Sequence, residues 1–104
     1  MKLWIDDLRE PPDDSWAWVK SSGQARGAMV LCAKMRTPVT EISFDHDLGD
    51  DDTAMPVARM LEEGAHEGTL PPIKWHIHSA NPVGRMNLKA ALESADRYWS
   101  ATVR

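Results

Sequence analysis

Three short apolar segments of this 104-residue chain each end in polar residues, and this repeated pattern constrains the fold most. Each segment has the length and composition of a buried β-strand. In an open α/β sheet the carboxyl ends of parallel strands gather at one crevice, where ligands bind. We therefore expect the polar clusters to lie together. The segments and the clusters that follow them are 2–5 with 6–7, 41–44 with 45–47, and 73–77 with 78–81.

Helical periodicity separates these strands. Ser21 and Gln24 form a capping box for a helix that ends before Thr37-Pro38. A second helix is predicted from about Thr53 to Gly64, and a third after residues 81–84. A weaker alternation at residues 16–19 favours a short edge strand. The order predicts one domain over residues 1–104, a small three-layer α/β sandwich with helices on both faces of a mostly parallel sheet of three or four strands.

Composition excludes several classes of protein. The formal net charge is −4, and no run of Lys or Arg provides a footprint for duplex nucleic acid. No segment approaches the roughly 20 apolar residues of a membrane span, and no signal-peptide core follows Met1. The single cysteine, Cys32, excludes an internal disulfide and lies on the apolar face of the first helix. We expect a cytoplasmic protein with no membrane partner and a buried thiol.

The acidic residues at the strand ends indicate a metal site. Asp6, Asp7 and Asp45 together supply the oxygen-rich cluster that a hard cation such as Mg²⁺ or Mn²⁺ prefers. Without a cation, three close carboxylates repel one another. The alternative is that Asp6 caps a turn and Asp7 is solvated.

The Asp45-His46-Asp47 cluster admits several chemistries. An EF-hand loop fails because Gly49 and Asp50 stand where a ligand and a glycine are required. A dehalogenase-type phosphatase carries its Asp-x-Asp on the first strand of a longer chain, whereas a receiver-type phospho-acceptor at Asp45 fits the order of elements. The candidate catalytic residues are His78, His46, Asp45 and Asp47.

Neutral donors and one arginine are candidates for binding phosphate. Arg9 follows the first Asp pair, and Ser79 and Asn81 follow the last strand, near a helix start whose backbone N–H groups favour anions. The alternatives are a surface arginine and ordinary turn and cap chemistry.

Other histidines and tryptophans have structural interpretations. His76 shares a strand face with His78 and is expected to be a hydrogen-bonded core residue. Trp4 is predicted to lie in the core. Trp16 and Trp18 are expected to pack under the loop that follows Asp6-Asp7, with stacking on a base as the alternative.

The three motifs, in order, resemble the cyclic-phosphate processing receiver-like family, a set of small domains related in fold to response-regulator receivers. The resemblance covers nearly the whole chain. It implies a truncated receiver, or flavodoxin-like, fold. The stretches that carry it are 3–11, 42–49 and 77–84.

The resemblance implies processing of a cyclic phosphate on a nucleotide or RNA end. Asp6, Asp7 and Asp45 match the acidic triad that holds Mg²⁺ in receivers, and Ser79 matches their conserved-type hydroxyl. Receivers carry a Lys-Pro pair where this chain has Asn81-Pro82, so switching through an aspartyl phosphate is disfavoured.

The resulting hypothesis is a phosphodiesterase that opens a 2′,3′-cyclic phosphate. One of the two histidines, His46 or His78, acts as the base and the other as the acid. Which of them is the base stays open. The alternatives are a nucleotide-binding module without turnover, a phospho-acceptor receiver, and a structural protein whose polar strand ends are turn chemistry.

Overall fold

The computed structural model describes residues 1–102 and has a parallel sheet with three helices. It confirms the receiver-like α/β fold, including the short strand at residues 16–19. The elements in chain order are β1 (Lys2–Ile5), β2 (Trp16–Val19), α1 (Ser22–Lys34), β3 (Glu41–Phe44), α2 (Met55–Glu67), β4 (Lys74–Ile77) and α3 (Pro82–Thr102).

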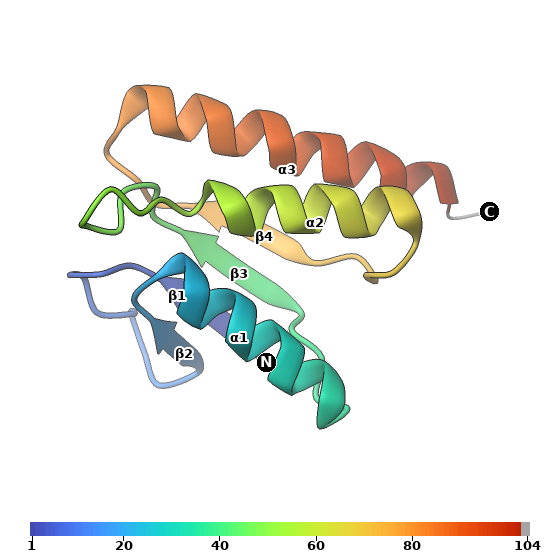
Figure 1. Cartoon of the computed structure of the whole chain (residues 1–104), viewed down its shortest axis with the longest axis horizontal. Helices are drawn as coiled ribbons and strands as arrows, with labels where there is room; N and C mark the ends of the chain where they lie inside the picture. The colour runs from blue at the N-terminus through green and yellow to red at the C-terminus, as the bar shows by residue number, and fades with distance from the viewer. Residues whose placement is uncertain (103–104) are drawn as a thin grey trace.

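The four strands are all parallel and run in the order β2-β1-β3-β4 (Figure 1). The register is even, since Ile5 pairs with both Val19 and Phe44, and Phe44 pairs with Ile77. The carboxyl ends of β1, β3 and β4 therefore meet at one edge of the sheet. This is the arrangement that the three polar clusters predicted.

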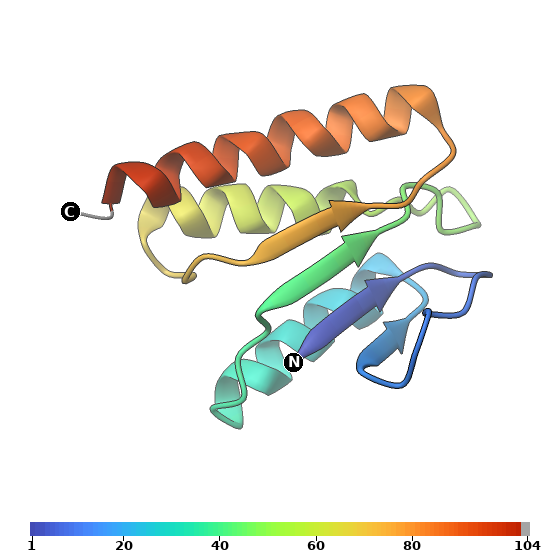
Figure 2. The ribbon, with the colours of Figure 1, turned by 180° about the vertical axis from the view of Figure 1, so that it is seen from behind.

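All three helices lie on one side of the sheet, and Figure 2 shows the strands uncovered from behind. The hydrophobic core lies between the helices and one sheet face, where Leu3, Ile5, Ile42 and Phe44 are fully buried. The prediction of a third layer, with helices on both sheet faces, is therefore wrong. Among the described residues the sandwich has two layers, and the second sheet face carries no helix.

The connection between β1 and β2 explains the missing layer. Residues 6–15 contain Pro11-Pro12, and paired prolines do not continue a helix. The segment instead forms a loop that projects past the carboxyl end of β1 and returns to β2 (Figure 2). Its backbone is tied to the open sheet face by the Trp4 indole N–H, which donates to the Arg9 carbonyl at 2.8 Å.

The helix boundaries differ modestly from the predicted ones. Ser21 caps α1 through its side chain, as expected. α2 begins later than predicted and continues past Gly64 to Gly68, which adopts the left-handed conformation (φ 74°) that ends helices. α3 begins at Pro82, because proline is well suited to a first helical turn.

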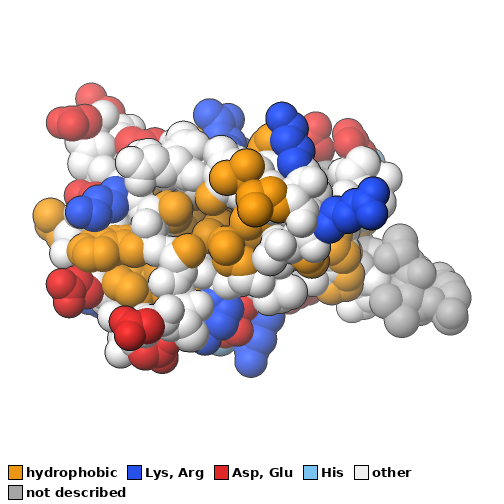
Figure 3. Space-filling view, turned by 90° about the horizontal axis from the view of Figure 1, so that it is seen from below, with side chains coloured by type: hydrophobic (Ala, Val, Ile, Leu, Met, Phe, Trp, Pro, Cys, Tyr) orange, Lys and Arg blue, Asp and Glu red, His pale blue; other side chains and the backbone are white. Residues whose placement is uncertain are grey.

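Hydrophobic side chains are also exposed on the lower side of the molecule, where α1 and β2 lie, and Figure 3 shows them as a band with charged groups at its margins. α1 alone exposes Val30, Leu31 and Met35. Cys32 on the same helix is buried and unpaired, as predicted. No helix within residues 1–102 is long and apolar enough to cross a membrane.

Candidate functional site

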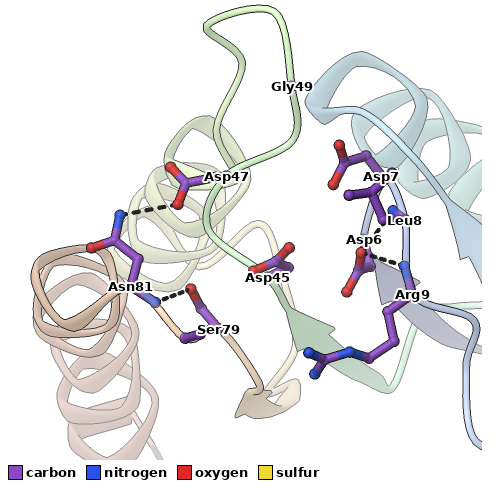
Figure 4. A pocket seen from close by; sticks show the side chains of 10 residues that line it. Asp6, Asp7, Leu8, Arg9, Asp45, Asp47, Gly49, Ser79 and Asn81 are labelled. Carbon is purple, nitrogen blue, oxygen red and sulfur yellow. Dashed lines mark hydrogen bonds between the residues drawn. The ribbon is translucent and has the colours of Figure 1, made fainter.

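A pocket of about 430 Å³ opens at the carboxyl ends of β1, β3 and β4 (Figure 4). Four carboxylates and one guanidinium line it, so its wall is strongly acidic. It brings together seven of the nine predicted site residues. The lining residues are Asp6, Asp7, Leu8, Arg9, Asp45, Asp47, Gly49, Ser79, Ala80 and Asn81.

Asp6 is the most buried carboxylate of the pocket, with 3% of its surface exposed. Its Oδ1 accepts the backbone N–H groups of Leu8 (2.9 Å) and Arg9 (2.8 Å), and its Oδ2 lies 3.1 Å from His78 Nε2. Burial alone would raise the pKa of Asp6. The hydrogen bonds from Arg9, Leu8 and His78 outweigh burial, and the pKa lies below its ordinary value. Asp6 is therefore an ionised carboxylate in a fixed orientation.

Asp45 stands at the end of the central strand beside Asp6 and Asp7. One carboxylate oxygen from each of the three residues lies within 4.8 Å of the others. Burial raises the pKa of Asp45, and the nearby charge of Asp6 raises it further. A divalent cation would remove this repulsion, and three carboxylate oxygens are the ligands that Mg²⁺ or Mn²⁺ prefers. The predicted metal residues therefore lie together and fit such an ion.

The loop after β3 closes the pocket on one side. Gly49 has φ 79°, and a side chain added there would approach Asp7 Oδ2 to 3.2 Å. Glycine thus meets two requirements at once, a left-handed backbone and close contact with an acidic residue.

The predicted phosphate ligands line the pocket, but each also has a structural role. Arg9 Nη1 donates to the His78 carbonyl at 3.5 Å. Ser79 is buried, and its Oγ accepts the Asn81 backbone N–H. Asn81 Oδ1 accepts the Gly84 N–H at 3.1 Å and so caps α3.

Asp47 is the carboxylate of the pocket that lies outside the metal cluster. Its Oδ1 lies 3.0 Å from His46 Nδ1, and its Oδ2 accepts the Asn81 side-chain N–H at 3.0 Å. These bonds hold the pKa of Asp47 below its ordinary value. The His46 ring packs on α3, where a Cβ at Gly84 would come within 2.4 Å of it. Asp47 thus contacts His46 and not His78.

Neither predicted catalytic histidine lines the pocket. The His46 side chain is 12% exposed and the His78 side chain 14%. His78 lies behind Asp6, on the open sheet face, with both ring nitrogens hydrogen-bonded. The His46 ring contacts the pocket residue Asp47, and the His46 backbone N–H donates to Asp45 Oδ1.

The prediction that His76 is a hydrogen-bonded core residue is only partly right. His76 is hydrogen-bonded, to Glu41 Oε2 at 2.6 Å, but its side chain is 43% exposed. It is not a core residue, because no helix within residues 1–102 covers its face of the sheet. Trp18 does contact the loop as predicted, since its indole N–H donates to the Asp6 carbonyl at 2.6 Å.

Two residues near the site were missed at the sequence level. Ser43 Oγ lies 2.7 Å from His78 Nδ1. The available signal was a hydroxyl between the apolar residues Ile42 and Phe44 of the strand. The Trp4 ring stacks on His78 at 3.9 Å with an interplanar angle of 5°. That contact depends on the strand register, which no local pattern gives.

Comparison with known families agrees with this geometry. A family model described as the cyclic-phosphate processing receiver domain matches residues 1–94. Searches of curated proteins and of solved structures each found no match.

Proposed function

The chain belongs to the cyclic-phosphate processing receiver domain family, and we propose that it hydrolyses a cyclic phosphate on a nucleotide or RNA end with the help of a divalent cation. The 2′,3′-cyclic phosphate is the preferred substrate. The observation that carries this proposal is the pocket at the strand ends, where a carboxylate cluster suited to a cation lies beside an arginine and a buried hydroxyl.

Charge supports the need for a cation. Four carboxylates face Arg9 alone, and no lysine is among the residues that line the pocket. An anionic phosphate would be repelled from such a wall. Asp6, Asp7 and Asp45 would hold Mg²⁺ or Mn²⁺, which when bound polarises phosphoryl oxygens and lowers the pKa of water.

The remaining residues act on the phosphate and the proton. Arg9 binds a non-bridging phosphoryl oxygen, and Ser79 and Asn81 line the opposite side of the pocket. The reaction forms one bond from water oxygen to phosphorus and breaks one bond from phosphorus to a ribose oxygen. Asp47, held by His46 and Asn81, accepts the proton of the attacking water. The departing ribose oxygen takes a proton from solvent water, to which Asp47 later returns its own.

A single-turnover assay tests the activity. Enzyme in excess over a 2′,3′-cyclic nucleotide, with Mg²⁺ or Mn²⁺, should give a phosphomonoester that phosphorus NMR detects. Asp47→Asn should slow the reaction at least about 100-fold, the usual contribution of a general base. Asp50→Asn, an exposed acid in the same loop, is the control and should react normally. No product with the wild-type protein and either metal would refute catalysis.

A phospho-acceptor receiver is the second candidate. Asp45 ends the central strand, and Ser79 contributes a hydrogen bond to it, which matches the receiver arrangement. An acid-labile modification that requires acetyl phosphate and disappears in Asp45→Asn would favour this alternative over hydrolysis.

A further inference from the structure

His78 has no ring nitrogen free for a substrate. Nε2 lies 3.1 Å from Asp6 Oδ2, and Nδ1 lies 2.7 Å from Ser43 Oγ. Because Asp6 is ionised and only accepts, Nε2 must carry the proton that it donates. The neutral ring then accepts the Ser43 hydroxyl proton at Nδ1. Ser43 thus selects the tautomer that bonds to Asp6.

The plane of the His78 ring is also fixed. Trp4 stacks on it at 3.9 Å with an interplanar angle of 5°. Trp4 is itself 8% exposed and is held by its indole N–H bond to the Arg9 carbonyl. The stacking contact and the two hydrogen bonds together fix the orientation of the imidazole.

Asp6 depends on this support. Its Oδ1 accepts two backbone N–H groups within its own loop, whereas among the described residues His78 is the side chain that holds Oδ2. Both lone pairs of Oδ1 are thereby used, and Oδ2 keeps a second lone pair for a cation. Residues that orient a metal ligand in this manner commonly change metal affinity 10- to 100-fold when they are removed.

We propose that His78 is a positioning residue that orients Asp6 for a divalent cation, with Ser43 fixing its tautomer and Trp4 its ring plane. The proposal rests on the cation of the proposed function. It replaces the acid–base role that the sequence suggested for His78.

Binding of Mn²⁺ alone, followed by electron paramagnetic resonance, tests the proposal without a substrate. His78→Leu should weaken Mn²⁺ binding about 10- to 100-fold. His78→Gln offers an amide N–H to Asp6 and should restore affinity to within about threefold of wild type. His76→Leu, two residues away on the same strand face, is the matched control and should bind normally.

The outcomes separate this proposal from the function. A folded His78→Leu protein with wild-type Mn²⁺ affinity would overturn the positioning role and leave the metal site intact. Should that variant not fold, Ser43→Ala replaces it, with an expected loss of about threefold or more, and unchanged affinity would count against the proposal. Absence of Mn²⁺ binding by the wild type would refute the cation itself and the positioning role with it.

Cyclic-nucleotide turnover by His78→Gln gives a second readout. The glutamine side chain cannot act as an acid or a base near neutral pH. Measurable turnover together with restored Mn²⁺ binding therefore supports the positioning role. Restored Mn²⁺ binding with turnover reduced at least about 100-fold would return His78 to acid–base catalysis.

Discussion

The two ends of the open sheet face carry similar residues in very different environments. At the carboxyl end, His78 lies between Ser43 and Asp6 under Trp4 and is 14% exposed. Two residues earlier on the same face, His76 bonds to Glu41, which starts β3 at the amino end of the sheet, and the His76 side chain is 43% exposed. The loop after β1 covers one end and leaves the other open. The comparison shows that two polar residues on the same sheet face can differ in burial. Whether such a residue is buried depends on the segment that packs over it.

The tryptophans should show the largest difference between the two ends. Trp4→Ala removes a buried ring that supports His78 and should cost about 3–5 kcal/mol of unfolding free energy. Trp16→Ala removes a partly exposed ring with edge contacts to Trp4 and His76 and the Lys2 ammonium over its face, together worth about 1 kcal/mol. Urea denaturation of both variants measures the difference between their losses of unfolding free energy. Equal losses would show that the loop does not distinguish the two ends.

The polar partners of the histidines should differ next. Ser43→Ala leaves Nδ1 of the buried His78 without a partner and should cost about 1–3 kcal/mol. Glu41→Gln affects a partly exposed pair and should lower stability less than Ser43→Ala does. Chemical denaturation at neutral pH provides the measurement. A greater loss for Glu41→Gln would reverse the comparison.

Asp45 at the covered end should be destabilising when no cation is bound. Its pKa is raised, so the folded state holds a proton more tightly than the unfolded state, and stability is lost as pH rises above the ordinary value of 3.8. In chelator at pH 7, Asp45→Asn should raise the melting temperature, by about 4–8 °C for each kcal/mol of relief.

Asp50→Asn is the matched control in the same loop and should melt like the wild type. A melting temperature of Asp45→Asn below that of the wild type would show that the carboxylate stabilises the apo fold.

The smallest expected effect is in the pH dependence. Burial lowers the pKa of His78 below 6.5, although Asp6 partly offsets it. Its contribution to stability is therefore complete above pH 6.5 and is lost as pH falls from there toward the folded-state pKa. Melting curves between pH 7.5 and 5.5 should show that the melting temperature of the wild type falls with pH. This fall should be smaller in His78→Gln and the same in His76→Gln. The same loss in all three proteins would assign it to another group.

Much of the fold was predictable because it depends on local patterns. The apolar strands, the Ser21 cap and the parallel order follow from residue type and spacing. The meeting of Asp6, Asp7 and Asp45 follows from topology alone.

The uncovered face and the role of His78 required knowledge of what lies above each strand. Residue types do not reveal that the 6–15 segment replaces a helix, so both sheet faces were expected to be covered. His78, at the end of β4, stacks on Trp4 of β1, and β3 lies between these two strands. Such a contact depends on the register of three strands, which local patterns do not give.

Nitrogen NMR of the histidine rings reports the tautomer of His78 directly and needs neither metal nor substrate. At neutral pH we expect one fixed neutral tautomer for His78, with Nε2 protonated and Nδ1 an acceptor. A charged His78, or one that averages between tautomers, would contradict the positioning role.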